Sequence, residues 1–353
     1  VTLPTTLTDM GQYTFKNCPA LTNITIPKNV TAGYNWFEDC TGLQEVTFAA
    51  GTKSVPAGAL RDASNVKTVN LPSGLISIGN QAFMCCYDLK DIILPTTLTD
   101  IGQYTFQNCT SLTSITIPKN VTAGSDLFEG CSDLKEVAFA PGTKSIPSGF
   151  LRDAYNVERV VLPEGLLTIG NQAFMDCYGL KDITLPTALT DMGEYTFQNC
   201  ISLTNITIPK NVTKGCDLFK GCSNLKEVVF ASGTKSIPTG FLRGAYNVER
   251  VVLPEGLLTI GNQAFMHCCG LKDITLPTTV VDLGSQTFYY CLSLEAITIP
   301  KSVEKFSELF EGCVRLTEIN LEQGIKAIPS SAFKAPVVQS INVPEGVVKI
   351  SSY

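Results

Sequence analysis

Few side chains in this sequence could carry acid–base or covalent chemistry, and only one of them is a histidine. His267 is the single histidine among 353 residues. Cys85 and Asp176 stand at the corresponding places of other repeats, so the position has no repeated role. Nucleophilic catalysis of the Ser/His/Asp or Cys/His kind needs a histidine base beside its nucleophile. We therefore expect no catalytic residues and no enzymatic activity.

The chain has fourteen cysteines, and eleven of them recur at one position of a repeat. These eleven are Cys18, Cys40, Cys86, Cys109, Cys131, Cys177, Cys200, Cys222, Cys268, Cys291 and Cys313. A thiol that recurs in phase with a repeat is most simply a small buried packing residue. Disulfides compete with this interpretation if the protein is extracellular. Cys85 and Cys269 lie outside the phase, and we expect them to be exposed.

The neighbouring residues 267–269, His-Cys-Cys, raise the question of a metal site. Adjacent side chains diverge, and structural zinc sites typically use cysteine pairs separated by two to four residues. Cys216 and Cys222 do not have this spacing either. We predict no metal site and no cofactor. Trp36 stands where other repeats have leucine, and we interpret it as a packing residue rather than as a platform for a sugar ring.

These residues belong to a short repeat that runs through the chain. Segments 94–184 and 185–275 are identical at 76 of 91 positions, so a 91-residue block has been duplicated. Each block holds four units of 22–23 residues. A landmark residue marks every unit: Phe15, Phe37, Leu60, Phe83, Phe106, Phe128, Leu151, Phe174, Phe197, Phe219, Leu242, Phe265, Phe288, Phe310 and Phe333. A period in the twenties predicts a solenoid of stacked units that share one thin core.

Each unit has an extended half and a turning half. In residues 112–118, apolar Ile115 and Ile117 flank Thr116, which is the period of a strand. Proline follows, and because it has no N–H to donate it ends the strand. In residues 166–177, Gly170 permits a bend, and Asn171 is a candidate N-cap for one short helical turn.

The pattern Leu-x-x-Ile-x-Leu-Pro-x-x-Leu-x-x-Ile-Gly-x-x-Ala-Phe-x-x-Cys resembles the BspA-like (Treponema-type) leucine-rich repeat family over the whole chain. The resemblance implies a right-handed β/α superhelix, with a parallel β-sheet on the concave side and short helical turns and extended segments on the convex side. It also implies a secreted or surface-displayed protein, of the kind usually described as an adhesin. One departure is that Asn29, Asn120 and Asn211 follow the strand in only one unit per block.

Charge and hydropathy limit the range of partners. The net charge of −6 argues against nucleic acid, because phosphate binding needs a concentrated basic face. No apolar run approaches the roughly 18 residues that would cross a bilayer. Residues 1–4 begin inside a repeat, so we expect the chain to be a piece of a longer protein whose signal peptide lies elsewhere.

Strand positions that face away from the core form rows of alternating charge, such as Glu136, Arg159 and Asp182. A neighbouring row, which includes Val161 and Val252, is apolar in the middle and polar towards its ends. One interpretation is self-neutralisation that stabilises the sheet; the other is a recognition surface with an apolar centre and a polar surround. The candidate binding residues are Glu136, Arg159, Val161, Asp182, Thr184, Glu227, Arg250, Val252 and Asp273.

Together these observations predict one leucine-rich repeat domain, residues 1–353, of about fifteen units in blocks 3–93, 94–184, 185–275 and 276–353. The predicted function is that of a non-enzymatic binding protein, secreted or on the cell surface, that contacts a protein or glycan on a host or neighbouring cell through its concave face. An intracellular scaffold or effector is the first alternative. A polysaccharide-active enzyme built on a solenoid is the second.

Overall fold

The computed structural model describes residues 1–329, 332–334 and 337–351. The chain divides into two compact units, Val1–Ile183 and Thr184–Tyr353, and each is described here by itself. Within both units every repeat forms one coil, and neighbouring coils are joined by parallel strand pairs. The predicted single domain over residues 1–353 stays a prediction.

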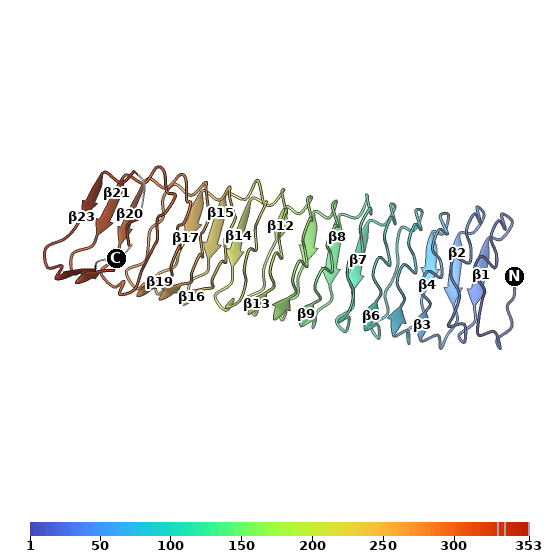
Figure 1. Ribbon diagram of the computed structural model, residues 1–353. Helices are drawn as coiled ribbons and strands as arrows, with labels where there is room; N and C mark the ends of the chain where they lie inside the picture. Colours follow the sequence, from blue (N-terminus) through green and yellow to red (C-terminus); the bar gives the residue numbers. More distant parts are fainter. Residues whose placement is uncertain (330–331, 335–336, 352–353) are drawn as a thin grey trace. The chain divides into compact units, whose positions relative to one another are not determined.

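The extended half of a coil supplies a main strand, and main strands of successive coils lie side by side, as β7 and β8 do (Figure 1). In the first unit these strands are β1 (Asn23–Ile26), β2 (Glu45–Phe48), β4 (Thr68–Asn70), β7 (Ser114–Ile117), β8 (Glu136–Phe139), β10 (Arg159–Val161) and β12 (Asp182–Ile183). In the second unit they are β14 (Asn205–Ile208), β15 (Glu227–Phe230), β17 (Arg250–Val252), β20 (Ala296–Ile299), β21 (Glu318–Leu321) and β23 (Ser340–Asn342).

The predicted alternation of buried and exposed residues is confirmed along these strands, except in β23, whose three residues are all exposed. In β7, Ile115 and Ile117 are buried and Thr116 is exposed. The register pairs Ile115 with Val137, and Val137 with Val160, so the partners lie one repeat apart. The same face of β7, β8 and β10 therefore enters one core.

A second, shorter ladder forms where the coil turns back. In the first unit it contains β3 (Ser54–Val55), β5 (Ser77–Ile78), β6 (Asp100–Ile101), β9 (Ser145–Ile146) and β11 (Thr168–Ile169). In the second unit its strands are β13 (Asp191–Met192), β16 (Ser236–Ile237), β18 (Thr259–Ile260), β19 (Asp282–Leu283), β22 (Ala327–Ile328) and β24 (Lys349–Ile350). Outward-facing hydroxyls connect neighbouring coils, since Thr168 Oγ1 lies 2.7 Å from Ser145 Oγ.

The expected short helical turns are not found, because the described residues contain no helix. In the segment predicted to turn helically, Gln172 and Asp176 have positive, left-handed φ angles of 56° and 59°. Left-handed residues four positions apart interrupt any run of right-handed helix. The amides divide between local turns, such as Ala173 N to Gly170 O at 3.3 Å, and bonds to the next coil, such as Leu151 N to Ala173 O at 2.8 Å. The predicted β/α superhelix is thus not confirmed, and the coils consist of strands and turns.

The landmark side chains form the centre of each unit's core. Phe174 and its counterparts are fully buried, apart from Phe15 and Phe333, which are half-buried. Phe106 and Phe128 stack with ring centroids 5.5 Å apart and planes at 6°. Stacked aromatic rings contribute beyond the area they bury, so this recurring pair ties one coil to the next.

The in-phase thiols are buried beside these rings, as the repeat predicted, except that Cys18 is only half-buried. Cys131 and Cys222, for example, reach back to the preceding coil: Cys131 Sγ lies 3.0 Å from the carbonyl oxygen of Phe106, and Cys222 Sγ 3.0 Å from that of Phe197. The expectation that Cys85 is exposed is wrong. Cys85 is buried, and the amide of Asn108 from the next coil covers its sulfur at 3.7 Å.

The main ladder is interrupted within both units. β4 makes only an isolated bridge to the next coil, between Thr68 and Asp91, and residues 92–94 form no strand. In the second unit, residues 273–276 likewise form no strand. Ile92 and Leu94 remain buried all the same, so the side chains keep the inward pattern while the backbone leaves the ladder.

Candidate binding surface

The outward side chains of the main strands form what we call the main-sheet face, defined by the nine candidate residues of the sequence analysis. In the first unit, Arg159 on β10 is in register with Glu136 on β8 and with Asp182 on β12. Its Nη1 lies 3.1 Å from Glu136 Oε2. The predicted attraction across the strands is confirmed for this pair, although both side chains stay exposed to solvent, Arg159 at 61%.

The second unit repeats the arrangement. Arg250 on β17 is in register with Glu227 on β15, and its Nη1 lies 2.9 Å from Glu227 Oε1. Thr184 and Asp273 are exposed but lie outside any strand. The structure therefore places seven of the nine residues on main strands and two on the unpaired segments that begin or precede a block.

A second row of charge runs beside the first. Glu158 lies 3.6 Å from Lys135 and 2.9 Å from Lys181. Glu249 repeats this between Lys226 at 2.9 Å and Lys272 at 3.0 Å. Hydrogen bonds from the lysines hold the pKa of both carboxyl groups below the usual range. Exposed ion pairs of this kind contribute little to stability, so a ligand could exchange them at small cost.

The row between the core-facing positions is apolar in its middle. Val161 and Val252 are half-buried, and Ala138 lies between Thr116 and Val161 in the register. Ile93 belongs to the same outward-facing row in the sequence, and 86% of its surface is exposed. Ile93 lies on the segment that interrupts the ladder. Thr184 and Thr275 occupy the corresponding positions of the second and third blocks.

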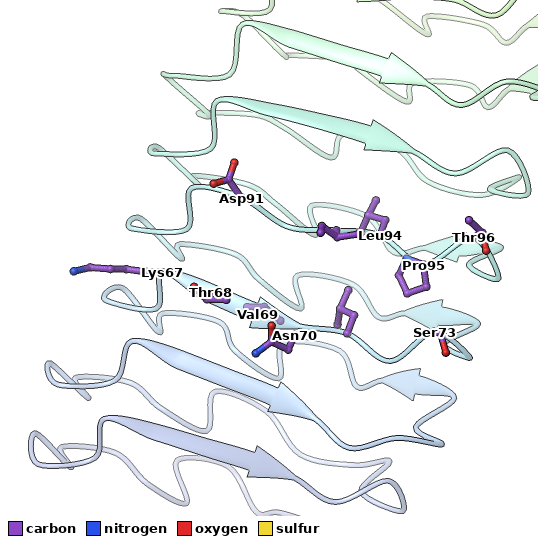
Figure 2. A pocket seen from close by; sticks show the side chains of 11 residues that line it. Lys67, Thr68, Val69, Asn70, Ser73, Asp91, Leu94, Pro95 and Thr96 are labelled. Atoms are coloured by element: carbon purple, nitrogen blue, oxygen red, sulfur yellow. The ribbon is translucent and has the colours of Figure 1, made fainter.

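A groove follows this interruption. It has a volume of about 690 Å³ and lies between β4 and residues 91–96. Figure 2 shows Lys67 and Asp91 towards one end, Asn70 in the middle, and Ser73 and Thr96 towards the other. A second groove of about 350 Å³ lies between residues 91–96 and β7, and Ile93 lines both. The break in the ladder thus creates an apolar projection between two grooves.

A buried polar network crosses three coils on the turning side. In the second block, Arg152 donates from Nε and Nη2 to Asp126, at 2.5 and 2.8 Å, and from Nη1 to Gln172 at 3.1 Å. Asp126 is 1% exposed. The third block repeats the network with Arg243, Asp217 and Gln263. Because a buried carboxylate is costly unless it is paired, the arginine stabilises the second and third blocks.

The remaining chemistry-bearing residues show no convergent site. His267 is half-buried among the rings of Tyr246, Tyr289 and Tyr290. Trp36 is fully buried and donates from Nε1 to the Met10 carbonyl at 3.2 Å, which confirms it as a packing residue.

Across 1–329, 332–334 and 337–351, no group of three or more His, Cys, Asp or Glu residues is arranged to hold a metal ion. In the same residues no helix has the length and apolar character of a membrane span.

Two ladders of parallel strands, repeated coils and a shared apolar core define a leucine-rich repeat solenoid. The family model described as the BspA type leucine rich repeat region, in six copies, matches residues 1–60, 31–155, 144–268 and 235–353. The chain belongs to this family of BspA-type leucine-rich repeat proteins. No curated protein matches it.

Several solved structures are similar. A leucine-rich repeat protein from Bacteroides ovatus is 26% identical, with a TM-score of 0.64 over 94% of this chain and 92% of that one. A leucine-rich cell surface protein from Faecalibacterium prausnitzii is 24% identical, with a TM-score of 0.40 over 98% and 83% of the two chains. The pneumococcal vaccine antigen PcpA is 17% identical, with a TM-score of 0.42 over 97% and 86%.

Proposed function

We propose that this chain is a non-enzymatic binding module, secreted or displayed at a cell surface, that holds a protein or glycan partner through the main-sheet face. The family resemblance is the ground for the extracellular location and for the adhesin-like role. We assign this face to the concave side, as in the sequence analysis. The proposal adds Ile93 and its two grooves to the contact surface.

One observation carries the proposal: the same exposed arrangement of charge and apolar side chains occurs in each compact unit. Glu136, Arg159 and Val161 in the first unit correspond to Glu227, Arg250 and Val252 in the second. The arginine side chains remain 61% and 70% exposed although each has an acidic partner. Arginine beside apolar side chains is enriched at protein interfaces. Duplication favours several weak contacts that act together through effective concentration.

The test uses purified extracellular-matrix proteins and arrayed glycans as probes in surface plasmon resonance. For any probe that binds, Arg159→Ala alone should weaken binding only a few-fold, because Arg250 remains. The combined variant Arg159→Ala, Arg250→Ala, Val161→Thr, Val252→Thr should weaken it by about a hundredfold or more. Valine to threonine keeps the branched shape, so the strands are retained.

A matched control changes the short ladder instead: Lys144→Ala, Lys235→Ala, Thr168→Val and Thr259→Val. Thr168 and Thr259 lie in the same coils as the four face residues, and Lys144 and Lys235 in the preceding coils, all on or beside β11 and β18 and their partner strands. The control should bind like the original chain. If the face variant binds normally while the control variant loses binding, the proposal is wrong and the turning side is the contact surface.

A further inference from the structure

We infer a saccharide-binding pocket on the turning side of the first block, separate from the main-sheet face and independent of the proposed function. It is a depression of about 430 Å³. Three tyrosines, Tyr13, Tyr34 and Tyr87, contribute to its wall. Asn35 and Arg61 line it as well, and acidic side chains complete the wall.

The pocket exists because the buried network of the other blocks is broken here. Asn35 stands where the second and third blocks have Asp126 and Asp217. In those blocks the aspartate accepts the Nε proton of Arg152 or Arg243, at 2.5 and 2.6 Å. In the first block, the Asn35 amide instead donates to Glu38 Oε2 at 3.1 Å and to Asp62 Oδ2 at 3.2 Å.

Those two hydrogen bonds fix which way the Asn35 amide points, since both partners are carboxylates that can only accept. Its oxygen is therefore left as an acceptor. Within the described part of the chain, Asn35 Oδ1 and Arg61 Nε are both buried without a hydrogen bond, although Arg61 Nε makes an ion-pair contact of 3.4 Å with Asp62 Oδ2. Asn35 is only 4% exposed. A buried polar atom without a partner is costly, so a ligand that satisfies both atoms would bind with an advantage.

Tyr34 is held in place as part of the same pocket. Its hydroxyl accepts a hydrogen bond from Arg61 and donates to Gln81 Oε1 at 3.3 Å. Its ring covers Gly58, where a Cβ would lie 2.0 Å from the ring, so only glycine fits beneath it. The second and third blocks have Ser125 and Cys216 in place of Tyr34. Of the three tyrosines, Tyr34 is therefore the one specific to the first block, because Tyr13 and Tyr87 correspond to Tyr104 and Tyr178 in the second.

The chemistry selects a neutral, polyhydroxylated ligand. A hydroxyl group both donates and accepts, so one hydroxyl or a vicinal pair can serve Asn35 Oδ1 and Arg61 Nε together. An ammonium group has no acceptor for Arg61, and a phosphate or carboxylate would meet Glu38, Asp39 and Asp62. The carboxylates can accept further hydroxyls, and tyrosine rings offer apolar faces to a sugar ring.

The experiment measures binding of neutral mono- and oligosaccharides to the full chain, first on an array and then by calorimetry at millimolar concentration. Asn35→Asp recreates the aspartate of the second and third blocks and offers Arg61 Nε a carboxylate to which it can donate a hydrogen bond. This change should keep or raise the melting temperature and lower saccharide affinity about tenfold or more. Tyr34→Ser, the residue of the second block, should also weaken binding. Tyr104→Ser, at the second block's counterpart of Tyr13, is the control and should leave binding unchanged.

Loss of saccharide binding in Asn35→Asp with an intact melting transition supports the pocket. Two results overturn it. The first is full binding by both Asn35→Asp and Tyr34→Ser. The second is the absence of binding to any neutral saccharide, which would mean that water alone satisfies the two buried atoms. Because the main-sheet variants leave Asn35 and Arg61 untouched, failure here is distinguishable from failure of the proposed function.

Discussion

At the scale of single residues, the repeated aromatic position contributes most to the core. Phe174 is fully buried. We expect Phe174→Ala to lower the free energy of unfolding by about 3–5 kcal/mol, because the apolar transfer is lost and a cavity is left. Urea denaturation measures the loss. Leu167→Ala in the same coil is the control, since the Leu167 side chain is 41% exposed, and it should cost far less. A similar small loss for Phe174→Ala would show that the landmark residues do not hold the core.

Because of the buried thiols, we expect the free energy of unfolding to depend on pH in the alkaline range. Burial raises the pKa of Cys131 and Cys222 to about 12. An unfolded thiol has a pKa of about 8.5, so above that pH the unfolded chain releases protons that the folded chain retains. The stabilisation is complete below about pH 8.5 and is lost as pH rises towards 12, by up to about 1.4 kcal/mol per pH unit for each thiol.

Urea denaturation at pH 7 and at pH 10 tests this dependence. The double variant Cys131→Ala and Cys222→Ala, which places at both positions the residue found at Ala154, should lose less stability between the two pH values than the original chain. An equal loss in both proteins would mean that these thiols do not titrate on unfolding.

At the scale of elements, the distance between neighbouring coils depends on small residues at the turn. Gly170 follows β11, and a Cβ there would lie 2.5 Å from Ser148 N and 2.8 Å from Pro147 C. These are backbone atoms of the preceding coil and cannot move aside. We expect Gly170→Ala to cost about 1–3 kcal/mol or more in unfolding free energy.

The matched control is Gly165→Ala, because a Cβ there would first meet Lys144 Nζ at 3.0 Å, the flexible end of a side chain. It should cost less than Gly170→Ala in the same denaturation measurement. Equal losses would indicate that general backbone flexibility, and not the contact between coils, requires glycine at residue 170.

The sequence predicts some elements well and others not at all. Alternation at Ile115 and Ile117 identifies the main strand because the two side chains must enter a thin core. The prediction of a helical turn in the turning half is wrong for two reasons. Residues such as Gln172 and Asp176 are left-handed, and several amides of this segment donate to carbonyl oxygens of the next coil. These bonds form only when coils stack, so residue preferences within one coil do not reveal them.

The candidate site was predictable only in part. The pairing of Arg159 with Glu136 follows from the repeat spacing. The outward position of Ile93 also follows from alternation, because its flanking residues Ile92 and Leu94 are buried. The break in the strand ladder at residues 92–94 does not follow from the repeat. The pocket of the first block carried a signal that a comparison of blocks could have revealed: Asn35 replaces an aspartate whose arginine partner is retained.

At the scale of the whole molecule, the chain presents the same exposed arrangement of charged and apolar side chains in each of two compact units. The 91-residue block copies strands, core and surface together, so a contact made by Arg159 has a counterpart at Arg250. In a solenoid, each coil depends mainly on its neighbours. Changes to the exposed face should therefore alter binding while leaving the fold intact.

The most direct test of the main-sheet proposal places a photo-crosslinking amino acid at Ala138 on β8 or at Val229 on β15, with Thr168 on β11 and Thr259 on β18 as controls. The probe is whichever matrix protein or glycan binds the original chain. The account predicts crosslinks to it from positions 138 and 229 and few or none from positions 168 and 259. Crosslinks from 168 and 259 alone would contradict it.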